Sequence, residues 1–244
     1  MDYLICSSPR VGSNLLSSLL RRTGRCGTPR EYLCPAEIAE HGPAAAGIGS
    51  TDGDPARFQR YYDGIREAFR DDGRFGLKAH LHQLRSALEG GFDFDRNLPD
   101  RFVLLSRADL VGQAISFARA LQTGAWISAK EEGREPRYDA AMIQSAMKEI
   151  LAEREGWERL FRGYGIEPYR LSYEALVEDM EGELAGVLEY LDVDPNTVDL
   201  ARAVEHSVGY FRRQRDGTSA AWRRRWTRDL RDHAVASQAA RRAA

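Results

Sequence analysis

The feature that most constrains this chain is a short apolar run that leads into a glycine-containing loop and then into a helix. Residues 3–8 form the run, Pro9-Arg10-Val11-Gly12 forms a turn, and leucines at positions 15, 16, 19 and 20 repeat at helical spacing. This order predicts a strand, a loop and a helix. Because backbone amides and the positive end of the helix dipole point out of such a loop, we expect residues 7–14 to hold a phosphate or sulfate group.

The loop follows the Walker frame but lacks the Walker chemistry. That frame reads Gly, four residues, Gly, Lys, then Ser or Thr. Here Ser7 and Gly12 take the glycine positions, while Ser13 and Asn14 replace the lysine and the metal-binding hydroxyl, which disfavours Mg²⁺-assisted phosphoryl transfer. Arg10 instead provides a planar, permanently charged group, which suits charge stabilisation without a metal. On spacing alone, a plain strand-turn-helix corner with a solvated arginine is an equally good interpretation.

Strand and helix patterns alternate along the rest of the chain. Residues 75–82 alternate apolar and polar side chains, which predicts a strand with Lys78, His80 and His82 on one face, most simply a solvent-exposed one. The patterns further predict strands at residues 101–107 and 167–172, a helix capped by Asp109, helices at residues 138–164 and 174–191, and a mobile loop at residues 39–54.

This alternation favours an α/β fold with a central parallel sheet, helices on both of its faces, and a single domain over residues 1–244. In such sheets, ligands bind at the carboxyl ends of the strands, where Ser8, Arg10 and Arg107 are placed. Ser116 lies about two turns into the helix after Arg107, so its hydroxyl and that arginine can bind one anion. A structural ion pair for Arg107 and a surface position for Ser116 are the alternatives.

Charge is distributed unevenly over the chain. The net charge of the whole chain is −2. Residues 201–244 contain 11 arginines and four acids, so this segment has a charge of +7 and the rest of the chain has a charge of −9. A basic segment favours an anionic ligand. It has few interleaved aromatic residues, so we expect a small anion and no nucleic acid.

The cysteines and the first residues predict the compartment. Cys6, Cys26 and Cys34 show no metal-ligand spacing, and an odd number of thiols argues against a disulfide framework. Residues 1–6 lack the basic and apolar regions of an export signal, and no segment approaches the roughly 18 apolar residues of a membrane span. We therefore expect a cytoplasmic protein without a membrane span.

Several motifs follow one another in a specific order. They are residues 8–14 (Ser-Pro-Arg-Val-Gly-Ser-Asn), 27–32 (Gly-Thr-Pro-Arg-Glu-Tyr), 75–78 (Phe-Gly-Leu-Lys), 106–107 with 113–117, 119–123 before Trp126, 155–157 (Glu-Gly-Trp) and 172–176 (Ser-Tyr-Glu-Ala-Leu). Together they resemble the carbohydrate sulfotransferases that depend on 3′-phosphoadenosine 5′-phosphosulfate (PAPS). The resemblance is greatest to the trehalose 2-sulfotransferase family, and it covers most of the chain.

The resemblance implies a P-loop-like sulfotransferase fold, PAPS as the donor, a homodimer, and a hydroxyl of a carbohydrate or glycolipid, such as trehalose, as the acceptor. It places the 3′-phosphate on Arg107 and Ser116, and a basic segment at about residues 205–244, with Arg213 and Arg215, over the nucleotide. The family usually has a hydroxyl residue at the position of Asn14, so we expect one contact to differ. The loop residues assigned to the 5′-phosphosulfate are Ser8, Pro9, Arg10, Val11, Gly12, Ser13 and Asn14.

In-line transfer at sulfur requires a base for the acceptor hydroxyl, and the resemblance puts the family's catalytic carboxylate at Glu31. Arg10 is expected to stabilise the negative charge that grows on the leaving oxygen. Lys78 is expected to reach the acceptor or the sulfuryl group, and His80 and His82 are the alternative bases. We expect no metal ion.

Two other classes of function compete with this interpretation. One is a nucleotide or nucleoside kinase of similar architecture, which Ser13 and Asn14 disfavour. The other is a non-catalytic regulator that binds the nucleotide without transferring sulfate.

Overall fold

The structure, a computed structural model, describes residues 1–46, 53–126, 135–208 and 217–243. Within them the chain forms two units. The first, Met1–Ala108 with Leu151–Gly209, contains the β-sheet, and the second, Asp109–Ile150 with Tyr210–Ala244, is helical.

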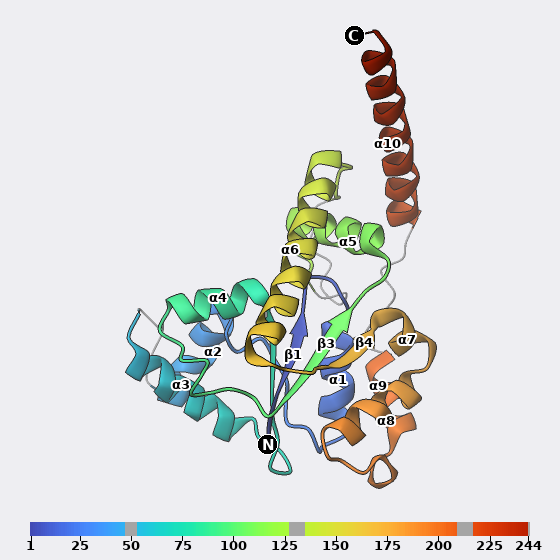
Figure 1. The fold of residues 1–244 in the computed structure, drawn as a ribbon. Coiled ribbons are helices and arrows are strands. Elements are labelled where there is room, and N and C mark those ends of the chain that lie inside the picture. The colour runs from blue at the N-terminus through green and yellow to red at the C-terminus, as the bar shows by residue number, and fades with distance from the viewer. Residues whose placement is uncertain (47–52, 127–134, 209–216, 244) are drawn as a thin grey trace. The chain divides into compact units, whose positions relative to one another are not determined.

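The sheet of the first unit consists of parallel strands in the order β2-β1-β3-β4 (Figure 1). The register pairs Leu4 of β1 with Leu77 of β2 on one side, and Ile5 of β1 with Val103 of β3 on the other. The parallel α/β fold predicted from the sequence is thus confirmed. The strands are β1 (Asp2–Ser7), β2 (Phe75–His80), β3 (Arg101–Ser106) and β4 (Tyr169–Ser172).

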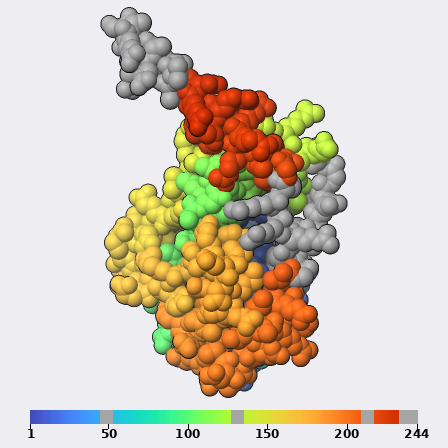
Figure 2. Space-filling view, turned by 90° about the vertical axis from the view of Figure 1, so that its right-hand side faces the viewer, coloured from blue at the N-terminus to red at the C-terminus, as the bar shows by residue number. Residues whose placement is uncertain are grey.

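Helices cover both faces of the sheet (Figure 1). On one face, apolar side chains of β1, β2 and β3 pack against α3, α4 and Trp157 and Phe161 of α6. On the other lie α1, α8 and α9; α7, α8 and α9 form a continuous orange surface in Figure 2. The helices with residues in this unit are α1 (Ser13–Arg22), α2 (Pro35–Ala46), α3 (Pro55–Ala68), α4 (Leu81–Glu89), α6 (Ala140–Tyr164), α7 (Tyr173–Glu178), α8 (Met180–Tyr190) and α9 (Leu200–Val208), with a 3₁₀ turn at Pro195–Thr197.

The second unit contains α5 (Leu110–Thr123), the first part of α6 and α10 (Gly217–Ala243). Trp222 and Trp226 of α10 are buried against apolar side chains of α5 and α6. Asp109 caps α5 by accepting a hydrogen bond from the Gly112 amide at 2.9 Å, as the sequence predicts, and it also pairs with Arg223 at 2.5 Å.

The predicted strand over residues 75–82 is wrong at its carboxyl end. β2 stops at His80, and α4 begins at Leu81 with a capping box in which the His80 amide donates to the Gln83 side chain at 2.9 Å. His82 therefore lies in the first turn of α4. The prediction of a solvent-exposed polar face is also wrong for Lys78, because that residue is only 4% exposed.

Two other sequence predictions require correction. Residues 39–46, predicted as part of a mobile loop, belong to α2, which contains Pro43; the alanine-rich composition favours this helix. The helix predicted over residues 174–191 is interrupted at Asp179, whose non-helical backbone ends α7 and whose side chain caps α8 through the Gly182 amide.

The thiols of Cys6, Cys26 and Cys34 are unpaired, as predicted. No helix in the described ranges is both long enough and apolar enough to cross a membrane.

Candidate active site

The loop between β1 and α1, residues 8–12, is tightly turned, as the predicted anion-binding role requires, and we call it the anion loop. Arg10 has φ of 62° and Gly12 has φ of 105°, so two residues adopt left-handed conformations within three positions. A Cβ atom at Gly12 would collide with the ring of Tyr173. Among the described residues no side chain caps α1, so its first turn begins with backbone amides directed at the loop.

Neighbouring elements hold this loop in place. The Arg107 guanidinium, just beyond β3, donates to the Arg10 carbonyl at 3.2 Å and lies 4.7 Å from the Tyr173 ring centroid. The buried indole of Trp157 donates to the Ser7 carbonyl at 2.9 Å. The carboxyl ends of β1 and β3 therefore meet at the loop, as the predicted parallel sheet requires.

The segment that carries Glu31 runs beside β2. The Lys78 amide donates to the Arg30 carbonyl at 2.9 Å. Gly27, at φ 66°, makes the turn before it, where a Cβ atom would lie 2.7 Å from the Phe69 carbonyl. The buried ring of Tyr32 stacks on Phe69 at 4.9 Å and anchors the other end. These contacts explain why Gly27 to Tyr32 form one motif.

The Glu31 carboxylate is held by side chains of β2 and α4. Lys78 Nζ lies 2.9 Å from Glu31 Oε1, and Gln83 Nε2 donates to Glu31 Oε2 at 2.7 Å. Lys78 also donates to the Asn14 side chain, at the start of α1. Lys78 therefore connects the anion loop to the carboxylate, so the structure brings together three residues that the sequence predicted for the site: Asn14, Glu31 and Lys78.

Lys78 keeps Glu31 ionised. Burial raises the pKa of Glu31, but the charge of Lys78 and hydrogen bonds from Gln83 and Lys78 outweigh it and lower the pKa to about 2. His80 lies 3.8 Å from Glu31, and its charge would act in the same direction. However, burial lowers the pKa of His80 to about 4, so His80 is neutral near pH 7 and Lys78 is the effective partner.

The other carboxylate at this end of β2 belongs to Glu153 of α6. It is 5% exposed and accepts from the amides of Leu81 and His82 at 2.6 and 2.8 Å, with His82 Nδ1 at 3.1 Å. Burial raises the pKa of Glu153, but these hydrogen bonds outweigh it and lower the pKa. Glu153 thus holds the first turn of α4, which carries Gln83.

Three of the residues predicted to bind the donor lie outside the unit that contains the loop or outside the described residues. Ser116 lies on α5 in the second unit, so its association with Arg107 of the first unit stays a prediction. Arg213 and Arg215 lie outside the described residues.

Three potential metal ligands lie together on α2. The ligand atoms of Glu37, Glu40 and His41 are within 4.8 Å of one another. However, the Arg30 guanidinium pairs with Glu37 at 3.0 Å and with Glu40 at 3.6 Å, so both acids already have a cationic partner. The expected absence of a metal stays a prediction.

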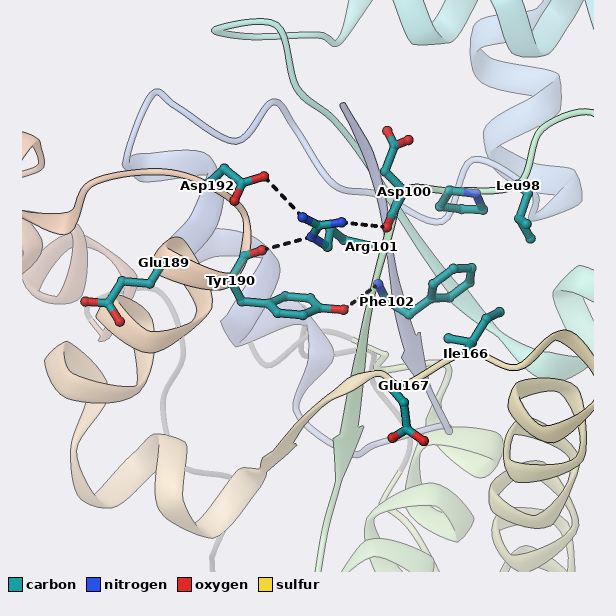
Figure 3. Close-up of a pocket in the computed structure, with 10 residues that line it drawn as sticks. Leu98, Asp100, Arg101, Phe102, Ile166, Glu167, Glu189, Tyr190 and Asp192 are labelled. Carbon is teal, nitrogen blue, oxygen red and sulfur yellow. Dashed lines mark hydrogen bonds and ion pairs between the residues drawn. The ribbon is translucent and has the colours of Figure 1, made fainter.

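A hollow of about 550 Å³ lies at the amino end of β3 (Figure 3). The anion loop, by contrast, follows the carboxyl end of β1. Arg101 at its wall donates to the carbonyls of Tyr190 and Asp100 at 3.3 Å and pairs with Asp192 at 3.4 Å. The cation of this hollow, Arg101, is thus already bound by groups of the hollow itself, and we do not place the chemistry there.

Comparison with known sequences assigns this architecture to a family. The sequence model described as Stf0 sulphotransferase matches residues 2–229. The chain belongs to the Stf0 sulphotransferase family. It is a sulfotransferase, and this placement confirms both the predicted class of enzyme and the predicted fold, while the kinase interpretation is not favoured.

Curated relatives in this sulfotransferase family match nearly the whole chain. The trehalose 2-sulfotransferase of Mycolicibacterium smegmatis is 29% identical over 266 residues, which cover 93% of this chain and 94% of that protein. The trehalose 2-sulfotransferase of Mycobacterium tuberculosis is 26% identical over 79% of this chain and 85% of that protein. A crystal structure of retinol dehydratase in complex with androsterone and the inactive cofactor PAP has a TM-score of 0.48 at 13% identity, covering 96% of this chain and 78% of that one.

Sequence reasoning missed Gln83 and Glu153 as parts of the site. Gln83 stands three residues after His80, which is the spacing of a capping box, but a histidine at the cap position hides that signal. Glu153 lies in an otherwise amphipathic helix, and nothing in its local sequence indicates that it is buried.

Proposed function

We propose that this sulfotransferase moves the sulfuryl group of PAPS to a hydroxyl of a sugar, with trehalose as the first acceptor to test. The anion loop supports the donor, and the names of the curated relatives support the acceptor. The observation that carries the proposal is the ionised Glu31 carboxylate, which Lys78 connects to Asn14 at the start of α1.

In this proposal the loop binds the 5′-phosphosulfate and Arg10 faces the bridging oxygen between sulfur and phosphorus. Further contacts to the 5′-phosphosulfate come from the loop residues Ser8, Pro9, Val11 and Ser13. The acceptor oxygen forms a bond to sulfur as the bond from sulfur to the bridging oxygen breaks. Glu31 takes the acceptor proton, and the leaving nucleotide keeps the electron pair, whose charge Arg10 and the loop amides stabilise.

A direct test uses PAPS labelled with ³⁵S and trehalose, with other disaccharides and glycolipid head groups in parallel. We expect labelled product from at least one sugar. PAPS binding without transfer to any of these acceptors would favour the regulator, and Mg²⁺-dependent ATP turnover would favour a kinase.

Lys78 has two roles in the proposal, because its ammonium can contact either Glu31 or the sulfuryl group. While it pairs with Glu31, the carboxylate is a weak base, with a pKa of about 2. The negative donor attracts Lys78, and weakening of the ion pair raises the pKa of Glu31 and makes it a better base.

Substituting Lys78 with Met tests this role. We expect a kcat lower by about 10- to 100-fold, because the transition state loses a cation. We also expect the acid limb of the kcat/KM profile, which reports the free enzyme, to move to higher pH, because burial then raises the pKa of Glu31 without the lysine to oppose it. A variant with an unchanged acid limb would contradict the pairing.

Arg107 is proposed to bind the 3′-phosphate with Ser116. The Arg107→Ala change should weaken the binding free energy of 3′-phosphoadenosine 5′-phosphate (PAP) by about 1.5 to 3 kcal/mol, or roughly 10- to 150-fold in affinity, while adenosine 5′-phosphosulfate, which lacks the 3′-phosphate, loses much less. Calorimetry with both nucleotides measures this difference. Equal losses for the two nucleotides would show that Arg107 acts only by holding the loop, through its contacts with the Arg10 carbonyl and the Tyr173 ring, and does not bind the 3′-phosphate.

Several finer statements belong to the same proposal. We propose that the chain acts in the cytoplasm as a homodimer, without a metal ion or nucleic acid, and that residues 1–244 form one sulfotransferase domain. We further propose that the segment at about residues 205–244 closes over the nucleotide through Arg213 and Arg215.

A further inference from the structure

Gln83 is a buried amide whose two ends have different partners. It occupies the third position of α4 and is 6% exposed. Its oxygen accepts from the His80 amide at 2.9 Å, and its nitrogen donates to Glu31 Oε2 at 2.7 Å. One side chain thus caps α4 and contacts the carboxylate that is proposed to be the base.

The orientation of this amide is fixed by chemistry. A backbone N–H can only donate, so the end of Gln83 that faces His80 has to be the oxygen. The NH₂ group is therefore always directed at Glu31. A rotation of the amide by 180° would place donor against donor at His80 and acceptor against carboxylate at Glu31, so both contacts oppose it.

The two donors to Glu31 also differ in how they respond to the substrate. Lys78 is charged and is shared with Asn14, so the negative donor nucleotide can attract it away from Oε1. Gln83 is neutral, and a helix cap anchors it, so it has no such reason to leave Oε2.

We propose that Gln83 is a positioning residue that fixes the Glu31 carboxylate through Oε2 and so reserves Oε1 as the oxygen that takes the acceptor proton. The proton leaves the acceptor hydroxyl as its oxygen bonds to sulfur, and it arrives on Oε1, which Lys78 has left. Oε2 remains an acceptor for Gln83 in both protonation states of Glu31. This inference rests on the proposed function of Glu31 as the base.

The decisive variant is Gln83→Glu, because glutamate keeps the shape and the acceptor for the His80 amide but replaces the donor to Glu31 with an oxygen. Two carboxylates then face each other, which raises the pKa of the pair. We expect a kcat for PAPS and trehalose lower by about 10- to 100-fold and an acid limb at higher pH, with PAP affinity within about twofold of the wild type.

A second readout does not require the acceptor. Protein labelled with ¹³C at the glutamate carboxyls, with Glu31 assigned through Glu31→Gln, reports the protonation of Glu31 directly. In the wild type we expect no titration of this carbon between pH 8 and 4, since the pKa of Glu31 is about 2. In Gln83→Glu we expect it to titrate within that range. If the wild type fails to sulfate trehalose, the choice of acceptor is wrong, whereas the carbon signal still decides the role of Gln83.

Two more variants separate positioning from stability. Gln83→Met removes both the cap and the donor, and Asp179→Ala removes only a helix cap, that of α8. We expect both to lower Tm but only Gln83→Met to lower kcat and move the acid limb. The inference is overturned if Gln83→Glu and Gln83→Met keep the wild-type Glu31 titration, or if Gln83→Met loses no more activity than Asp179→Ala.

Discussion

Replacing Glu31 with Gln should lower single-turnover sulfuryl transfer by about 10²- to 10⁴-fold while PAP affinity stays close to that of the wild type. Glutamine keeps the size of the side chain but cannot accept the proton of the hydroxyl. Binding of the nucleotide is proposed to depend on the anion loop, whose contacts with Arg107 and Trp157 do not involve Glu31. Rapid-quench measurements with saturating PAPS separate the two steps.

The pH dependence of the same variant gives an internal control. The wild-type rate should fall at acid pH as a carboxylate takes a proton, and this limb should vanish in Glu31→Gln together with most of the rate. A variant with near-normal transfer would direct attention to His80 or His82. His80 is the less suitable of the two, because burial lowers its pKa to about 4.

Stability should respond to the same substitution in a defined pH window. The pKa of Glu31 in the folded chain, about 2, lies below its ordinary value of 4.5, so its ionised form stabilises the fold fully above pH 4.5. That stabilisation is lost as the pH falls through 4.5 towards 2. The wild type should therefore have the higher Tm at pH 7, and the difference from Glu31→Gln should shrink on acidification.

Replacing Arg10 with Ala should lower kcat by about 10²- to 10³-fold, in line with the loss of one preorganised donor to a developing oxyanion. The guanidinium is proposed to bind the bridging oxygen more strongly as the bond to sulfur breaks. Its left-handed backbone, at φ of 62°, is part of the anion loop and should survive in a lysine variant. Steady-state kinetics with varied PAPS give kcat and KM separately.

Lysine at position 10 is the matched control, since it keeps a positive charge without the planar fork. We expect it to restore only part of the lost kcat. If Arg10→Ala changes KM alone, the arginine only holds the donor and does not stabilise the transition state. Alanine and lysine both keep the Cβ atom that strains a left-handed backbone, so neither variant relieves that strain, and comparing their Tm values checks that the loop still folds.

Local patterns in the sequence were sufficient for the strand, loop and helix at residues 3–20. The signals here are an apolar run, a glycine and leucines at helical spacing, and each is set by residues close together in the chain. The structure has the strand where this pattern predicts it, paired with β2 and β3. The cap at Asp109 could be predicted as well, because its partner, the Gly112 amide, lies only three residues away. The identity of Glu31 as a site residue needed the resemblance, because one acid in a loop has no distinctive spacing.

Contacts between residues far apart in the sequence decided where β2 ends and whether Lys78 is buried, which the local sequence pattern does not indicate. The alternation of residues 75–82 continues through His82, yet Glu153, distant in sequence, binds the amides of Leu81 and His82 and starts a helix there. Whether Lys78 is exposed depends on Glu31 and Asn14, which lie 47 and 64 positions away, and the structure buries its ammonium between them. The sequence by itself was sufficient to predict the anion loop and the parallel α/β order, since local patterns of apolar side chains and turn residues indicate both. Only the tertiary structure decided that Lys78, Gln83 and Glu31 form one site, because the free energy of a buried charge depends on partners that the chain brings together by folding.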